Sequence, residues 1–257
     1  MACVVESIDL KLLRATEHFC AIQNGIAAYT ATKPYQIVHD SDGKEKGFRV
    51  LVDPPLPLSV LVGELIYQLR STIDHLAFGL INKTDWTKLP RDWEGKCAFP
   101  LHLLPPKVSP TPRSAFEREM PGISDNVFEF IEAIQPYHAA NRDKARHLRW
   151  LSQLSNFDKH RYLNLIYQKG RYIQAIRKAD GDTAFSLQTV YHGAEFKRET
   201  PDSTSTMDAK AGFFPFVGFD EAILLDGGQL PAQEVLQLCF DAVENFIVPK
   251  MCEFLNQ

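Results

Sequence analysis

Residues 58–81 read LSVLVGELIYQLRSTIDHLAFGLI, a stretch so rich in apolar side chains that it predicts a helix buried on most of its faces. Within it, residues 69–76 place an arginine, an acid and a histidine in an otherwise apolar run, namely Arg70, Asp74 and His75. Polar groups among buried residues need partners or a chemical role. The stretch therefore predicts both the central helix of the fold and a first candidate site.

The same reasoning extends outward along the chain. Apolar spacings of three and four predict three further long helices, over residues 7–29, 142–168 and 231–255, and two short ones, over residues 113–120 and 124–134. Glycine-containing turns between β-rich runs predict two hairpins, which we expect to extend one sheet. A proline-rich stretch, residues 84–113, predicts a long ordered loop over the bundle.

These elements predict an α+β fold, a predominantly helical bundle of about four long helices with inserted β-hairpins. The hairpin insertions fall near residues 34–53 and 171–226. Because the β segments interrupt the helices and are not collected at one end, we expect a single domain over residues 1–257.

Composition narrows the class of protein. The chain has 257 residues, 45% of them hydrophobic and 23% charged, a formal net charge of −4 and five scattered cysteines without a C-x-x-C pair. It has no segment suited to a signal peptide or a membrane span, so we expect a cytoplasmic protein without membrane contact. Walker, G-x-G-x-x-G, G-x-S-x-G and zinc-ribbon motifs are absent from the sequence, and we expect no cofactor.

The spacing of the polar residues in the central helix suggests a site. Arg70 and Asp74 are four residues apart and can pair, as can Ser71 and His75 on the adjacent face. Arg70 and His75 are separated by roughly 140° around the helix axis, so both can border one cleft without touching.

The R-x4-H spacing within a helical bundle resembles the HEPN superfamily, whose members are helical, usually dimeric and often metal-independent endoribonucleases. The resemblance implies that Arg70 holds the scissile phosphate, that His75 moves the proton during attack of the ribose 2′-hydroxyl, and that the protein is a homodimer acting on RNA. The combination of L-R-S-x-x-D-H-L with N-x-D-K-H-R also resembles an uncharacterised bacterial protein family, which implies no activity.

A second polar cluster lies in the predicted helix of residues 142–168. Asn156 and His160 share one face, and His160 can reach the same ligand as His75. Residues 142–178 carry ten basic residues against two acids, which favours an anionic partner. We therefore expect catalysis by Arg70, Asp74, His75 and His160, and RNA binding by Arg149, Asn156, Lys159 and Arg161.

Two other interpretations remain open. The polar clusters can be structural, fixing helix register in a non-catalytic binding or scaffold protein. A metal-dependent enzyme is the third, because bundles of the DinB type hold a divalent ion with histidines from three helices, and His18, His75 and His160 come from three predicted helices.

Overall fold

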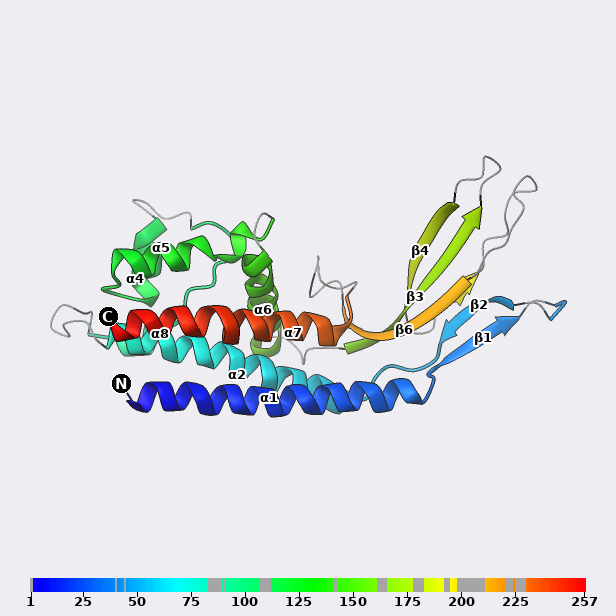
Figure 1. Ribbon diagram of the computed structural model, residues 1–257, viewed down its shortest axis with the longest axis horizontal. Helices are drawn as coiled ribbons and strands as arrows, with labels where there is room; N and C mark the ends of the chain where they lie inside the picture. The colour runs from blue at the N-terminus through cyan, green and yellow to red at the C-terminus, as the bar shows by residue number, and fades with distance from the viewer. Residues whose placement is uncertain are drawn as a thin grey trace. The chain divides into compact units, whose positions relative to one another are not determined.

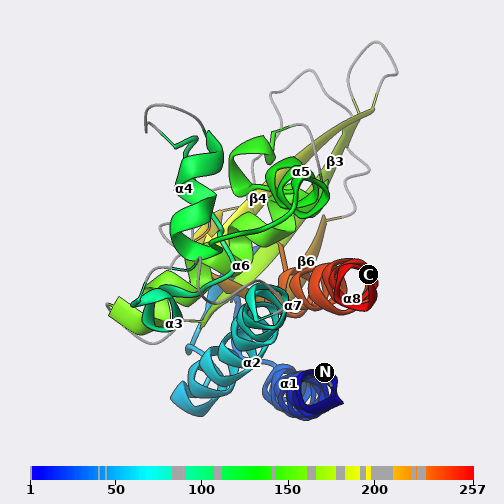
Figure 2. The ribbon, with the colours of Figure 1, turned by 90° about the vertical axis from the view of Figure 1, so that its left-hand side faces the viewer.

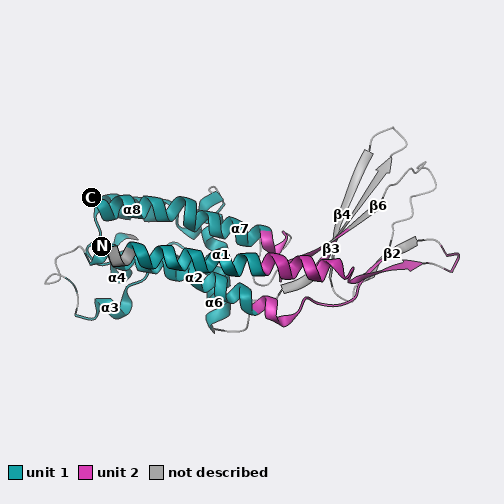
Figure 3. Ribbon diagram, turned by 60° about the horizontal axis from the view of Figure 1, so that its bottom comes forward, with its two compact units in different colours: residues 1–21, 60–164, 234–257 teal, residues 22–59, 165–233 magenta. Residues whose placement is uncertain are grey.

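The computed structural model describes residues 2–39, 41–43, 45–82, 89, 91–106, 112–140, 143–160, 166–177, 183–191, 195–197, 211–220, 224 and 230–257. The fold is α+β and mostly helical (Figure 1). The chain divides into two compact units (Figure 3): unit 1 comprises residues 1–21, 60–164 and 234–257, and unit 2 comprises residues 22–59 and 165–233. Both predicted hairpin regions fall mainly in unit 2.

Unit 1 is built from helices. Its members are most of α1 (Ala2–Ala31), α2 (Leu56–Ile81) and α7 (Ala232–Ala242), with all of α3 (Trp93–Lys96), α4 (Pro112–Glu119), α5 (Asp125–Ala133), the 3₁₀ turn η2 (Pro136–His138), α6 (Asp143–His160) and α8 (Val248–Asn256). Within the unit, α1, α2 and the α7–α8 run lie side by side, and α6 crosses them at a steep angle (Figures 1 and 2).

The core of unit 1 follows from the apolar spacing of these helices. On α2, Leu65, Leu69, Ile73 and Leu76 are fully buried at spacings of three and four. The ring of Phe19 on α1 packs 6.1 Å from that of Phe240 on α7. The other helices complete the core with fully buried side chains such as Phe116, Ile131, Leu148, Leu151, Val243 and Met251. The hydrophobic stretch that opened the sequence is thus the central helix.

The C-terminal helix differs from its prediction. A continuous helix was expected over residues 231–255, but a π-helical segment, Val243–Ile247, separates α7 from α8. Pro249 explains the break, because its ring clashes with the carbonyl four residues earlier in a regular α-helix. The N–H of Val248 instead bonds the carbonyl of Val243, five residues back. The prediction of about four long helices is therefore not confirmed, whereas the mostly helical α+β class is.

The β strands of unit 2 form two small sheets instead of the single sheet expected. The first hairpin, β1 (Tyr35–His39) and β2 (Glu45–Val50), takes β5 (Glu195–Lys197) on the free edge of β2, in the order β1-β2-β5. The second hairpin, β3 (Ile166–Arg177) and β4 (Thr183–Tyr191), pairs with β6 (Ala211–Phe219) in the order β4-β3-β6. All these pairs are antiparallel.

The helix predicted over residues 142–168 is shorter than expected. Its described part ends at His160, and strand β3 begins at Ile166. Residues 166–168 pair with β6, and from Lys169 onward the strand pairs with β4 as well, so sheet hydrogen bonds outweigh the local helical pattern.

Candidate functional site

Arg70 and Asp74 pair on α2, at the spacing that the sequence suggested. The guanidinium Nη2 lies 3.0 Å from Asp74 Oδ1, and both side chains also bond the backbone of Phe99, in the segment that follows α2. Arg70 Nη2 donates to the carbonyl of Phe99 at 2.6 Å, and the N–H of Phe99 donates to Asp74 Oδ1 at 2.8 Å. The pair therefore satisfies both backbone polar groups of a residue whose own side chain is fully buried.

Other groups hold the rest of this segment, residues 97–102, which we call the Phe99 strap. The N–H of Ala98 donates to the carbonyl of Glu119 at 3.2 Å. The buried Gln135 amide donates to the carbonyl of Pro100 and accepts from the N–H of His102, each at 2.9 Å. The strap is thus fastened along its length by side chains and backbone of α2, α4 and the end of α5.

Titratable groups around the strap have shifted pKa values. Burial raises the pKa of Glu119, with Asp74 acting in the same direction and Arg70 against it. Burial and then Arg70 lower the pKa of His102. Burial, followed by the charge of Asp74, raises the pKa of Cys97 to about 11. Burial, which disfavours the charged form of each group, is the largest cause of all three shifts, as expected for a packed contact.

His75 faces a different neighbour. Its Nδ1 shares a hydrogen bond of 3.0 Å with the Oγ of Ser7 on α1, the partner that sequence reasoning had sought at Ser71. Burial and then the nearby ammonium of Lys11 lower the pKa of His75, with Asp74 opposing them. Arg70 contacts the Phe99 strap, so the two residues of the R-x4-H motif do not line the same cleft.

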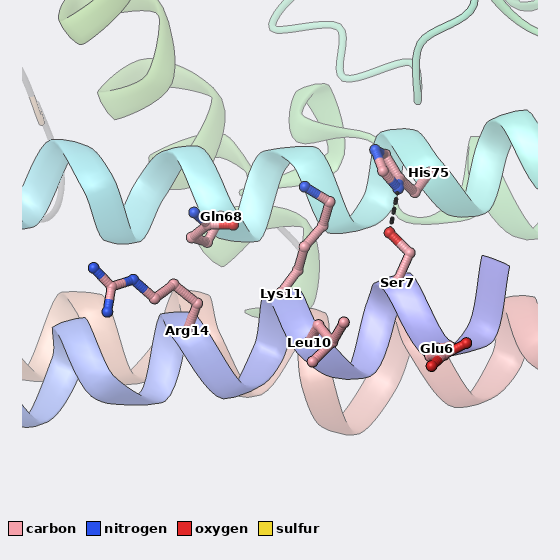
Figure 4. A pocket seen from close by; sticks show the side chains of 7 residues that line it. All are labelled: Glu6, Ser7, Leu10, Lys11, Arg14, Gln68 and His75. Carbon is pink, nitrogen blue, oxygen red and sulfur yellow. Dashed lines mark hydrogen bonds between the residues drawn. The ribbon is translucent and has the colours of Figure 1, made fainter. Parts of the chain in front are cut away.

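The cleft that contains His75 is an open groove between α1 and α2, with a volume of about 470 Å³. We call it the α1–α2 groove, and its lining residues are Glu6, Ser7, Leu10, Lys11, Arg14, Gln68 and His75. Lys11 extends from α1 toward α2, between Gln68 and His75 (Figure 4). Arg14 pairs with the exposed Glu17 at 2.7 Å. In the described part of the chain, no carboxylate forms an ion pair with Lys11.

The second predicted cluster lies at the C-terminal end of α6. Asn156 and Lys159 are exposed, and Arg149 is half-buried. By its spacing of three residues, Asp158 can pair with Arg161. The carboxylate of Asp158 lies against Gly63 of α2, where an added Cβ would be 2.6 Å from Oδ1. Arg161 and the side chain of His160 lie outside the described residues.

The three-histidine metal site remains a separate question. His18 is buried, and its Nδ1 lies 3.2 Å from Glu64 of α2. Among the residues whose placement is described, no group of three histidine, cysteine or carboxylate side chains is arranged to hold a metal ion. The side chain of His160, the third histidine of that interpretation, lies outside the described residues, so the three-histidine site stays a prediction.

Sequence reasoning missed most of the groove. The helix predicted over residues 7–29 begins earlier in the structure, at Ala2, so Ser7 lies inside α1. A signal was present, because Ser7, Lys11 and Arg14 follow spacings of four and three, and Gln68 and His75 are seven residues apart. These spacings place each set on one helix face, but the sequence does not say that the two faces meet.

Comparison with known proteins does not place the chain in a family. No protein-family model, no curated protein sequence and no solved structure matches the chain. In the described helices, none is long and apolar enough to cross a membrane.

Proposed function

We propose that the chain binds single-stranded RNA in the α1–α2 groove and does not cleave it. The observation that carries the proposal is the groove itself, where Ser7, Lys11, Arg14, Gln68 and His75 bring hydrogen-bond donors to an open surface. Arg70 and Asp74, by contrast, are engaged with the backbone of Phe99. This division favours a binding protein with a structural Arg-Asp pair over an endoribonuclease that uses Arg70 and His75 together.

The chemistry of the groove suits a phosphate chain. Lys11 supplies a compact positive charge, and Arg14 supplies a fork of donors next to it. Tyr67, on α2 beside Gln68 in sequence, is 55% exposed, and Leu10 on the groove wall is 61% exposed. Single-stranded RNA is recognised by this combination of cations for the backbone and exposed rings for base stacking.

The test is the salt dependence of RNA binding, measured by fluorescence anisotropy with a labelled single-stranded RNA. Each phosphate neutralised on a single strand contributes about 0.7 to the slope of log K against log salt. We expect Lys11→Ala and Arg14→Ala each to weaken binding and to reduce the slope by roughly that amount. Arg91→Ala, at an exposed arginine outside the groove, is the matched control and should change neither.

The same preparation decides whether RNA is cleaved. A mixed, labelled RNA pool incubated with the parent protein in EDTA should remain intact. Cleavage that disappears in folded His75→Ala and in folded Arg70→Ala would replace this proposal with the metal-independent endoribonuclease that the HEPN resemblance implies.

The homodimer and the cytoplasmic location expected from the sequence belong to the same proposal. The described cysteines, Cys20, Cys97, Cys239 and Cys252, are free thiols, as is usual in a reducing compartment. A dimer would present two grooves to one RNA strand. Sedimentation equilibrium with and without RNA measures the number of chains in the complex, and a monomer under both conditions would remove the dimer from the proposal.

A further inference from the structure

A second pocket lies between α3 and α4 of unit 1, which are neighbours in the fold (Figure 2). We call it the α3–α4 pocket, and its lining residues are Asp92, Trp93, Lys96, Ser114, Glu117, Arg118 and Pro121. Its volume is about 410 Å³, within the range of about 300–1,000 Å³ that is typical of small-molecule sites. None of these residues lines the α1–α2 groove. The α3–α4 pocket is therefore a separate candidate site.

The apolar part of the α3–α4 pocket is formed by Trp93 and Pro121, which are both buried. The Trp93 ring stacks on that of Phe78 of α2, with the centroids 5.5 Å apart and the planes at 22°. The N–H of Ala98, two residues after α3, donates to the carbonyl of Glu119, the last residue of α4, and so ties the two walls together. The pocket thus has a preformed apolar surface with a fixed indole ring, which suits an aromatic ligand.

The charges on the pocket wall leave one cation without a carboxylate. Lys96 forms an ion pair with Asp92. On α4, Glu117 accepts a hydrogen bond of 2.8 Å from the Nε of Arg113. In the part of the chain that the structure describes, Arg118 makes no ion pair. A guanidinium binds a carboxylate through two parallel hydrogen bonds, so Arg118 favours a ligand with that group.

We propose that the α3–α4 pocket binds a small aryl carboxylate, with the carboxylate on the guanidinium of Arg118 and the ring against Trp93 and Pro121. An inorganic anion would leave the apolar surface uncovered, and a neutral aromatic molecule would leave Arg118 without a counter-ion. An aryl carboxylate satisfies both parts of the pocket. The site is independent of RNA binding in the α1–α2 groove.

The experiment uses isothermal titration calorimetry to compare the affinities of 2-naphthoate and 2-naphthamide, which share a ring system and differ in charge. We expect one naphthoate to bind each chain. Because Arg118 is exposed, its ion pair should make the parent prefer naphthoate by about fivefold. Arg118→Gln should lose this preference and bind naphthamide as the parent does. Arg91→Gln, at an exposed arginine that does not line the pocket, is the matched control and should keep it.

Nuclear magnetic resonance of the indole N–H groups locates the probe. Naphthoate should shift the signal of Trp93, which is assigned with Trp93→Phe, and should leave in place the signal of Trp150, which is buried on α6. Failure of naphthoate to bind, equal affinity of the parent for the two probes, a preference that survives Arg118→Gln, or an unshifted Trp93 signal would each overturn the inference. None of these results bears on RNA binding, so the two proposals fail separately.

Discussion

At the scale of single residues, Arg70 of the R-x4-H motif has a structural role. Its guanidinium bonds Asp74 and the carbonyl of Phe99, and only 15% of its side chain is exposed. Removing it leaves the Asp74 carboxylate and the Phe99 carbonyl without their partner. We expect Arg70→Ala to lower the free energy of unfolding by about 2–4 kcal/mol, measured by urea denaturation, and to leave RNA affinity unchanged under conditions where it remains folded.

The partner residue provides the control for this prediction. Because Arg70 and Asp74 pair with each other and bond the backbone of the same residue, Arg70→Ala combined with Asp74→Ala should cost clearly less than the sum of the two single changes. A folded Arg70→Ala protein of parental stability that no longer binds RNA would contradict the structural role and would place Arg70 in the binding site.

The close contact between Gly63 and Asp158 leads to a second prediction about stability at the scale of single residues. A Cβ at this position would lie 2.6 Å from Oδ1 and 3.1 Å from Cγ of Asp158, so the carboxylate of α6 must move away. Overpacking costs typically about 1–3 kcal/mol, and the better helix propensity of alanine returns up to about 1 kcal/mol. We expect Gly63→Ala to destabilise the protein by about 1 kcal/mol in urea denaturation, net of that gain.

Replacing Asp158 tests whether contact with its carboxylate causes the destabilisation by Gly63→Ala. In an Asp158→Ala background the space beside Gly63 is open, so Gly63→Ala should become neutral or stabilising there. The same destabilisation in both backgrounds would mean that the backbone of α2 and not the contact with Asp158 requires glycine.

At the scale of elements, the Phe99 strap is bound to the helices mostly through side chains. Gln135 is fully buried and bonds both Pro100 and His102. We expect Gln135→Leu to leave one carbonyl and one N–H unpaired, at about 1–3 kcal/mol each, and to accelerate amide hydrogen exchange at His102. Gln23→Leu, at an exposed glutamine, should leave the exchange rate of that amide unchanged. Protection of His102 that persists in Gln135→Leu would mean that the strap is held by other contacts.

The contacts of the Phe99 strap also show which parts of the structure could be predicted from the sequence and which could not. Spacing on one helix predicted the Arg70–Asp74 pair, and alternating β-rich runs around turns predicted both hairpins. The partner of that pair, Phe99, lies 29 residues from Arg70, and the partner of His75 lies 68 residues away on α1. Periodicity fixes which residues share a face of one element, but it contains no information about which faces meet. The groove therefore became visible only when α1 and α2 were placed together.

At the scale of the whole molecule, buried histidines link stability to pH. Burial is the largest cause that lowers the pKa of four buried or half-buried histidines below the ordinary value of histidine, namely His18, His75, His102 and His147. Below pH 6.5 the unfolded chain therefore binds protons that the folded chain does not, so stability falls as pH falls. Glu119 acts in the opposite direction, because its raised pKa gives stability at acid pH that is lost as pH rises through its folded value.

Four histidines outnumber this one carboxyl, and the ordinary pKa of histidine, about 6.5, lies nearer to neutrality than that of glutamate, about 4.3. We expect the melting temperature to fall steadily between pH 7.5 and pH 5.5, two values that bracket the ordinary pKa of histidine, about 6.5. In His18→Gln, which removes a buried titrating ring, the fall should be smaller than in the parent. In His39→Gln, which removes an exposed ring on β1, it should match the parent. A melting temperature that stays constant or rises as the pH falls from 7.5 to 5.5 would mean that the histidines are protonated in the folded protein. Burial would then not lower their pKa values.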